Sequence, residues 1–268
     1  HTRLQGDWSS DVCSSACEPL RTHLPDNDRT LCRVLAPTLR SRRWARVSIM
    51  KTAAESSSFQ ITQLIAINVA KASTIGCLLA LALIYGVQDP RQLIYLCLHI
   101  SYCVWWLLEQ WLFPDRRRYI FTEKIGILTT LFVVLFVGVF YAFPGYLAFT
   151  NPQPISYWTI AIALPLYIFG SLINTSADVQ KMTAKSMGAG LVKDGAWRSV
   201  RNINYFGDLM RYTSFAVIAG SPWAYVLPAS ILLLYVQRIL QKEQSMADKY
   251  PDFAAYQQSS RRLLPWIW

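Results

Sequence analysis

Ionisable and amide side chains form three groups at helical spacing, each at the border of an apolar segment. Asn174, Asp178 and Lys181 stand at i, i+4 and i+7, so they share one face of a helix. The other groups are Asn204, Asp208 and Arg211, and Arg238 with Lys242. Carboxylate and amide acceptors beside cationic donors suit a ligand with ribose hydroxyls and phosphates. The spacing therefore predicts one polar pocket shared by three helices.

The alternative is that these side chains are helix-end charges in the headgroup region, where they pair with one another and with lipid. All three groups fall at the same level, and glycines punctuate the stretch between the first two groups, at Gly188, Gly190, Gly195 and Gly207. This convergence favours the ligand pocket.

The elements that carry these groups are predicted to cross a membrane. Of 268 residues, 53% are apolar and 16% are charged, against about 25% charged in a soluble domain. No Asp, Glu, Lys or Arg occurs between Ile125 and Ala177, or between Tyr212 and Gln237. A helix needs roughly 20 apolar residues to cross the bilayer core. The expected fold is an all-α, polytopic membrane bundle.

Six transmembrane helices are predicted, at about 61–87, 92–113, 125–147, 156–177, 204–219 and 222–240. Lys and Arg concentrate in 114–124, in 178–203 and after residue 237, whereas the alternate connections carry a single Arg. The positive-inside rule then places both termini in the cytoplasm. The net charge of +10 indicates loops that face anionic lipid and a phosphorylated cofactor, not nucleic acid. The membrane is that of the endoplasmic reticulum or a bacterial inner membrane, and the oligomeric state is left open.

The first 49 residues differ from the rest in composition. They hold eight Arg and no Lys, and no apolar run. We expect residues 1–49 to be a non-native or disordered extension, Met50 to be the natural start, and residues 50–268 to form a single transmembrane domain. An organelle transit peptide is the alternative, which the acidic residues of this segment disfavour. The remaining cysteines show no spacing for a metal site or a disulfide framework.

Three stretches of the C-terminal part resemble a known superfamily. Residues 190–208 read Gly-Leu-Val-Lys-Asp-Gly-Ala-Trp-Arg-Ser-Val-Arg-Asn-Ile-Asn-Tyr-Phe-Gly-Asp. They resemble the G-L-W-x-x-S-R-H-P-N-Y-F-G-E signature of the steroid 5-alpha-reductase, sterol reductase and DUF1295 superfamily. Residues 173–181 are similar to its N-x-x-x-D-x-x-K/R stretch, and 249–268 to its C-terminal tail. The resemblance covers roughly residues 165–268.

The resemblance implies an NADPH-dependent reductase that saturates a carbon–carbon double bond in a lipid taken from the bilayer. Asn174 and Asp178, with Lys181 on the same face, would hold the adenine-ribose end of the cofactor. The other implied contacts are Arg201, Asn204, Tyr205 and Asp208 near the nicotinamide and pyrophosphate, and Arg238 and Lys242 at phosphates. Asn202 and Ile203 replace the signature His and Pro, so any proton transfer by that His is lost here.

Such a reduction needs one proton from the protein and a group that polarises the substrate, because the cofactor provides the hydride. In the 5-alpha-reductases a Tyr and a Glu of the N-terminal half do this. The best match is Tyr102 with Glu109, which share a helical face with Trp105 at i, i+3 and i+7. The alternative is that these are packing and interfacial aromatics.

Two other functions compete with the reductase. Isoprenylcysteine and phospholipid methyltransferases carry a similar R-H-P-x-Y-x-G stretch and bind S-adenosylmethionine in a comparable cavity, and Glu243 after Arg238 fits their pattern. They lack the stretch of Asn174, Asp178 and Lys181, which favours the reductase. A non-catalytic relative that acts as a lipid sensor or scaffold is the third possibility, and it is supported by the loss of the signature His.

Overall fold

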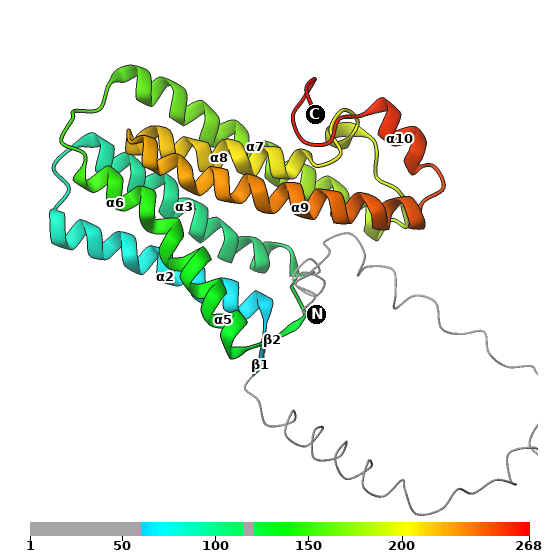
Figure 1. Cartoon of the computed structure of the whole chain (residues 1–268), viewed down its shortest axis with the longest axis horizontal. Coiled ribbons are helices and arrows are strands. Elements are labelled where there is room, and N and C mark those ends of the chain that lie inside the picture. Colours follow the sequence, from blue (N-terminus) through cyan, green and yellow to red (C-terminus); the bar gives the residue numbers. More distant parts are fainter. Residues whose placement is uncertain (1–59, 115–120) are drawn as a thin grey trace, which may run out of the picture.

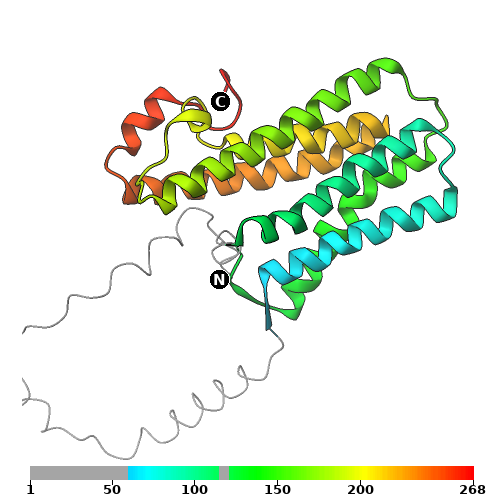
Figure 2. The same cartoon turned by 180° about the vertical axis from the view of Figure 1, so that it is seen from behind.

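The computed structural model describes residues 60–114 and 121–268. These residues form long helices that run side by side with alternating direction (Figures 1 and 2). The predicted all-α bundle is confirmed. The expectations for residues 1–49 and for Met50, and the basic run Arg116–Arg118, lie outside the described residues.

The helices follow the predicted spans to within about four residues, except that α7 and α9 run on to Ser186 and Lys249, past the predicted ends at 177 and 240. In chain order they are the strand β1 (Gln60–Thr62), α2 (Gln63–Tyr85), α3 (Pro90–Leu112), the strand β2 (Lys124–Gly126), α5 (Ile127–Val133), the π-helix η1 (Val134–Val139), the 3-10 turn η2 (Phe140–Ala142), α6 (Phe143–Thr150), α7 (Tyr157–Ser186), the 3-10 turn η3 (Gly195–Trp197), α8 (Ile203–Ala219), the 3-10 turn η4 (Pro222–Tyr225), α9 (Val226–Lys249) and α10 (Phe253–Ser259). The run from α5 to α6, Ile127–Thr150, is one continuous helical rod that includes η1 and η2.

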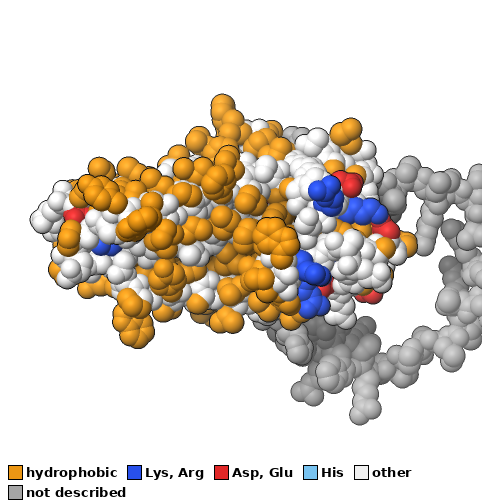
Figure 3. All heavy atoms as spheres, turned by 90° about the horizontal axis from the view of Figure 1, so that it is seen from above, with side chains coloured by type: hydrophobic (Ala, Val, Ile, Leu, Met, Phe, Trp, Pro, Cys, Tyr) orange, Lys and Arg blue, Asp and Glu red, His pale blue; other side chains and the backbone are white. Residues whose placement is uncertain are grey.

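Within the described residues, five helical segments are long and apolar enough to cross a membrane: α2, α3, Ile127–Thr150, α7 and Pro222–Lys249. The chain is a multi-pass membrane protein. Its hydrophobic side chains cover the long helices, and Lys and Arg gather mainly at one end (Figure 3).

The fifth predicted span, 204–219, is α8, which has 17 residues and is shorter than a full crossing. It packs against α7 above all, and also against α3, α6 and α9 (Figure 1). Most of its residues are buried, among them Asn204 and Arg211. Because its neighbours enclose it, α8 carries charged groups without exposing them to lipid.

The short connections lie together at one end of the bundle, and Arg91 fixes them there. Asp89 caps the start of α3 by accepting a hydrogen bond from the Arg91 backbone N–H at 2.6 Å. The buried Arg91 guanidinium donates to the carbonyl oxygens of Ile218 at 2.6 Å and Gln153 at 3.0 Å. The single Arg of these connections therefore ties the start of α3 to the end of α8.

At the opposite end, β1 and β2 form a two-stranded antiparallel sheet, with Ile61 opposite Ile125. This sheet joins the start of α2 to the start of α5. The chain after α9 folds back over the same end, where α10 and the C-terminus lie (Figure 1). The polar groups of the predicted pocket lie toward this end of the bundle, where α7 ends and α8 begins. This end also holds the longer connections.

Two glycines set the distance between α7 and α8. A Cβ atom on Gly207 would lie 2.6 Å from the Gly170 carbonyl oxygen and 2.7 Å from the Asn174 nitrogen, and a Cβ on Gly170 would lie 2.6 Å from the Gly207 carbonyl oxygen. Small residues let two membrane helices approach backbone to backbone. This crossing brings the polar faces of α7 and α8 into hydrogen-bond range.

Gly207→Ala is expected to destabilise the fold by about 1–3 kcal/mol, the usual cost of overpacking. Thermal unfolding of the full chain in detergent measures it. Gly76→Ala in α2 is the matched control, because a Cβ there meets nothing within 4 Å. Equal unfolding midpoints for the two variants would contradict the tight crossing.

Candidate active site

A cavity of about 710 Å³ opens between the two sides of the bundle. Residues of α2, α3 and the α5–η1 rod line one side, and residues of α7, α8 and α9 line the other. Its volume lies within the ~300–1,000 Å³ that ligand pockets occupy.

The structure brings most of the predicted site residues to this one cavity. From the predicted sets, its walls include Tyr102, Glu109, Asn174, Asp178, Asn204, Tyr205, Asp208 and Arg238. The remaining three, Lys181, Arg201 and Lys242, line a second, much smaller pocket. Most of the predicted residues therefore share one cavity, as expected, but Lys181, Arg201 and Lys242 line a separate, smaller pocket.

The wall between α7 and α8 is built from amides and one carboxylate. Asn174 Nδ2 donates to the Asn204 carbonyl oxygen at 3.0 Å, and Asn204 Nδ2 donates to Asp178 Oδ1 at 3.1 Å. The buried Asn204 Oδ1 has no hydrogen-bond partner. A buried polar atom of this kind calls for a partner that the cavity can admit.

An ion pair between a buried arginine and a partly buried aspartate extends this wall to α9. Arg211 pairs with Asp208 one turn before it on α8, and also donates to Asn174 Oδ1 at 3.3 Å. Asp208 Oδ2 accepts a hydrogen bond from the Tyr235 hydroxyl at 2.7 Å. The Tyr235 ring stacks on Tyr205, with 4.2 Å between the ring centroids. Helices α7, α8 and α9 are therefore joined by one polar network.

On the opposite wall, the Tyr102 hydroxyl takes part in a chain of hydrogen bonds. It accepts from Lys71 Nζ of α2 at 2.8 Å, and its oxygen lies 2.5 Å from the Tyr212 hydroxyl of α8. The Arg211 guanidinium lies 4.5 Å from the Tyr102 ring centroid. These three side chains and Tyr102 are all buried.

Tyr102 is thus paired with Lys71 and Tyr212, not with Glu109 as the resemblance implied. Glu109 is also buried and lines the cavity, about 10 Å further along α3 at the rise of 1.5 Å per residue. Sequence reasoning missed Lys71. The signal that marks it is a single ionisable residue inside an otherwise apolar span.

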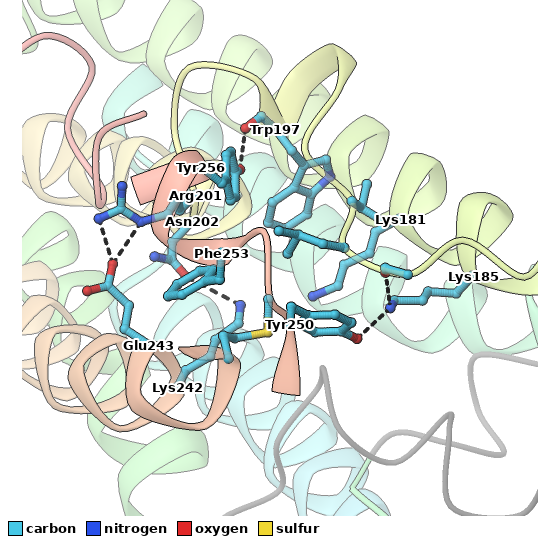
Figure 4. A pocket seen from close by; sticks show the side chains of 14 residues that line it. Lys181, Lys185, Trp197, Arg201, Asn202, Lys242, Glu243, Tyr250, Phe253 and Tyr256 are labelled. Carbon is cyan, nitrogen blue, oxygen red and sulfur yellow. Dashed lines mark hydrogen bonds and ion pairs between the residues drawn. The ribbon is translucent and has the colours of Figure 1, made fainter. Parts of the chain in front are cut away.

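The second pocket, of about 30 Å³, has room for only a few water molecules. Figure 4 shows its aromatic and basic side chains converging between the end of α7, the end of α9 and the C-terminal segment, which is the chain after α9 (250–268). Lys181 Nζ lies 5.0 Å from the Trp197 ring centroid, and Lys242 Nζ lies 5.9 Å from it. Lys185 donates to the Tyr250 hydroxyl at 2.9 Å.

Arg201 holds the C-terminal segment in place. Its Nε donates to Glu243 Oε1 at 2.8 Å, and its Nη1 donates to the carbonyl oxygens of Ser260 at 2.6 Å and Gln257 at 3.1 Å. Glu243 Oε2 also accepts from Arg262 Nε at 2.9 Å. The guanidinium is satisfied inside the protein, so Arg201 has a structural role at the border of the second pocket.

Residues 59–260 match the family described as "Protein of unknown function (DUF1295)". The chain belongs to this family. It is also similar to a protein named Delta(14)-sterol reductase from Arabidopsis thaliana, with 24% identity over 199 residues, which are 68% of this chain and 53% of the reductase. The chain therefore spans about half the length of that relative.

The match to the DUF1295 family starts at residue 59 and includes α2 and α3, whereas the motifs in the sequence covered roughly 165–268. Within this DUF1295 protein, Asn202 stands where the superfamily signature has His, and its side chain has a structural role. Asn202 Nδ2 donates to the Arg262 carbonyl oxygen at 2.9 Å, and Asn202 Oδ1 accepts from Lys242 Nζ at 3.3 Å. The side chain at this position fastens the C-terminal segment to α9.

The C-terminal segment is fastened at two further points. The Tyr256 hydroxyl donates to the Trp197 carbonyl oxygen, and burial raises the pKa of Tyr256. At the surface, Lys193 Nζ donates to Asp252 Oδ2 at 2.7 Å, and this hydrogen bond lowers the pKa of Asp252. The loop before α8 and the chain after α9 are therefore joined by hydrogen bonds and an ion pair.

Arg201→Met should destabilise the protein by about 1.5–3 kcal/mol, the range of a hydrogen bond to a charged group, because Glu243 loses one of its two cations and keeps Arg262. Thermal unfolding and the rate of proteolysis after α9 measure this. Arg198→Met is the control, since Arg198 is exposed. A wild-type unfolding midpoint for Arg201→Met, together with lost ligand binding, would instead assign Arg201 to the ligand.

Proposed function

We propose that this DUF1295 family protein is a membrane-embedded, NAD(P)H-dependent reductase that saturates a carbon–carbon double bond in a lipid. The observation that carries the proposal is one cavity that joins the amide–carboxylate wall of α7 and α8 to the Tyr102 hydroxyl. The similarity to a protein named as a sterol reductase agrees with it.

The residues present suit a dinucleotide. Asn174, Asp178 and Asn204 offer acceptors and donors for ribose hydroxyls, and Asn204 Oδ1 and Arg211 Nε are buried without a hydrogen-bond partner. Arg238 is exposed on α9 at the edge of the cavity and provides a cation for phosphate. When bound, the reduced nicotinamide supplies the hydride.

The opposite part of the cavity suits a lipid. Apart from Thr129, its lining on α5 and η1 is apolar, with Phe132, Val133, Phe136 and Val137, and α9 adds Ile231 and Leu234. A lipid from the bilayer that lies here has its reacting part near Tyr102. The Tyr102 hydroxyl holds the proton that the reduction consumes, and Lys71 and Tyr212 fix its orientation.

The S-adenosylmethionine-dependent methyltransferase is the second candidate. Glu243 was the residue that favoured it, yet both carboxylate oxygens of Glu243 are bonded to Arg201 and Arg262. Glu243 lines the small pocket and not the large cavity. This arrangement favours the reductase.

Titration of the full chain in detergent with NADPH, and separately with S-adenosylmethionine, tests the proposal through thermal stability. NADPH should stabilise the fold by about 2.7 kcal/mol at 100 times its Kd. Arg238→Ala, which removes a charge-assisted contact, and Asp178→Ala should each weaken binding ~10- to 100-fold. The exposed Arg198→Ala is the control.

Stabilisation by S-adenosylmethionine alone would replace the reductase by the methyltransferase. A response to neither ligand would favour the non-catalytic lipid sensor or scaffold. Normal NADPH binding by both Arg238→Ala and Asp178→Ala would show that the cofactor lies elsewhere.

A further inference from the structure

Lys71 is a buried cation in the middle of α2. Its Nζ lies 4.1 Å from the Tyr102 ring centroid and 4.9 Å from that of Tyr141, and its hydrogen bond goes to the Tyr102 hydroxyl. Among the described residues no carboxylate forms an ion pair with Lys71, whereas Arg211 has Asp208. A charge inside a membrane protein is costly and marks a functional position.

The positive charge is concentrated around the Tyr102 side chain. Lys71 contacts the hydroxyl from α2, and the Arg211 guanidinium covers the ring from α8. The carboxylate nearest to this group in the network is Asp208, which is already bonded to Arg211 and Tyr235. A substrate atom that accepts a hydrogen bond from Tyr102 therefore meets a locally positive environment.

We propose that Lys71 acts through Tyr102 to stabilise negative charge that develops on the substrate, which selects a double bond conjugated to a carbonyl. This inference rests on the proposed reductase function. An isolated double bond would have to be protonated first, which leaves a carbocation beside Lys71 and Arg211. Like charges at short range in a site of low polarity oppose that route.

The electrons and protons balance along this route. The β-carbon accepts a hydride from the reduced nicotinamide, and the π electrons of the double bond move toward the carbonyl oxygen, which becomes an enolate oxygen. The Tyr102 hydroxyl donates to that oxygen and releases its proton to it. The Lys71 ammonium returns a proton to Tyr102, and solvent reprotonates Lys71. Tautomerisation gives the saturated carbonyl, so one hydride and one proton are consumed.

A pair of steroids with the same ring skeleton tests the sign of this charge without requiring turnover. One carries a carboxylate and the other a primary amine at the position of the ketone. The wild-type full chain should bind the carboxylate ~10-fold or more tightly than the amine, the range of a hydrogen bond to a charged group. Lys71→Met should remove this preference, Lys71→Arg should restore it, and the exposed Lys193→Met should leave it unchanged.

Tyr102→Phe separates the two roles, because it removes the proton donor and keeps the cation. It should retain the carboxylate preference and lose NADPH oxidation with a 3-oxo-4-ene steroid. An amine that binds as tightly as the carboxylate, an unchanged preference in Lys71→Met, or binding of neither steroid would overturn the inference. Carboxylate preference without any NADPH binding would instead reject the proposed reductase and leave the role of Lys71 intact.

Discussion

A polar side chain inside a bilayer must find its partner within the protein, and helix α8 is where this DUF1295 protein meets that constraint. Asn204, Asp208 and Arg211 project from one short helix that its neighbours enclose. The glycine contact between Gly170 and Gly207 draws α7 close enough for Asn174 and Asp178 to provide partners. Without that close crossing, the same side chains would face lipid at a cost of several kcal/mol each.

The same enclosure explains why a cavity exists where it does. The polar faces of α7, α8 and α9 satisfy one another on one side, and α2 and α3 contribute Lys71 and Tyr102 on the other. Tyr212 on α8 joins the two sides through the Tyr102 hydroxyl. A ligand that enters between them meets donors and acceptors whose orientation is already fixed, as preorganised sites require.

Much of this fold follows from local patterns. Apolar runs located the start of every long helix to within about four residues, and the i, i+4 spacing placed Asn174 with Asp178 on the cavity wall, whereas Lys181 at i+7 lines the smaller pocket. The enclosure of α8 could not be read from its own 17 residues, because it depends on which helices surround it. The clear departures from the predicted spans are the ends of α7 and α9, which continue to Ser186 and Lys249, beyond the predicted ends at 177 and 240.

The site was predicted less completely, for a related reason. Arg201 and Glu243 are 42 positions apart and Lys71 and Tyr102 are 31 apart, and no periodicity links such pairs. Arg201 matched the superfamily motif, yet its partners lie on α9, at Glu243, and in the C-terminal segment, at Gln257 and Ser260. Lys71 belongs to no motif in the sequence. Its place in an apolar span marks it, but its partner Tyr102 is set by the packing of α2 against α3.

The structure of the full chain with bound NADPH tests the central claim most directly. We predict that the dinucleotide occupies the large cavity, with its adenine ribose at Asn174 and Asp178 and its nicotinamide on the side of Tyr102. The reactive carbon should leave space for a substrate atom about 3–3.5 Å away, the separation of a near-attack geometry. A dinucleotide bound outside the cavity at Lys181 and Lys242, or with its nicotinamide turned away from Tyr102, would contradict the account.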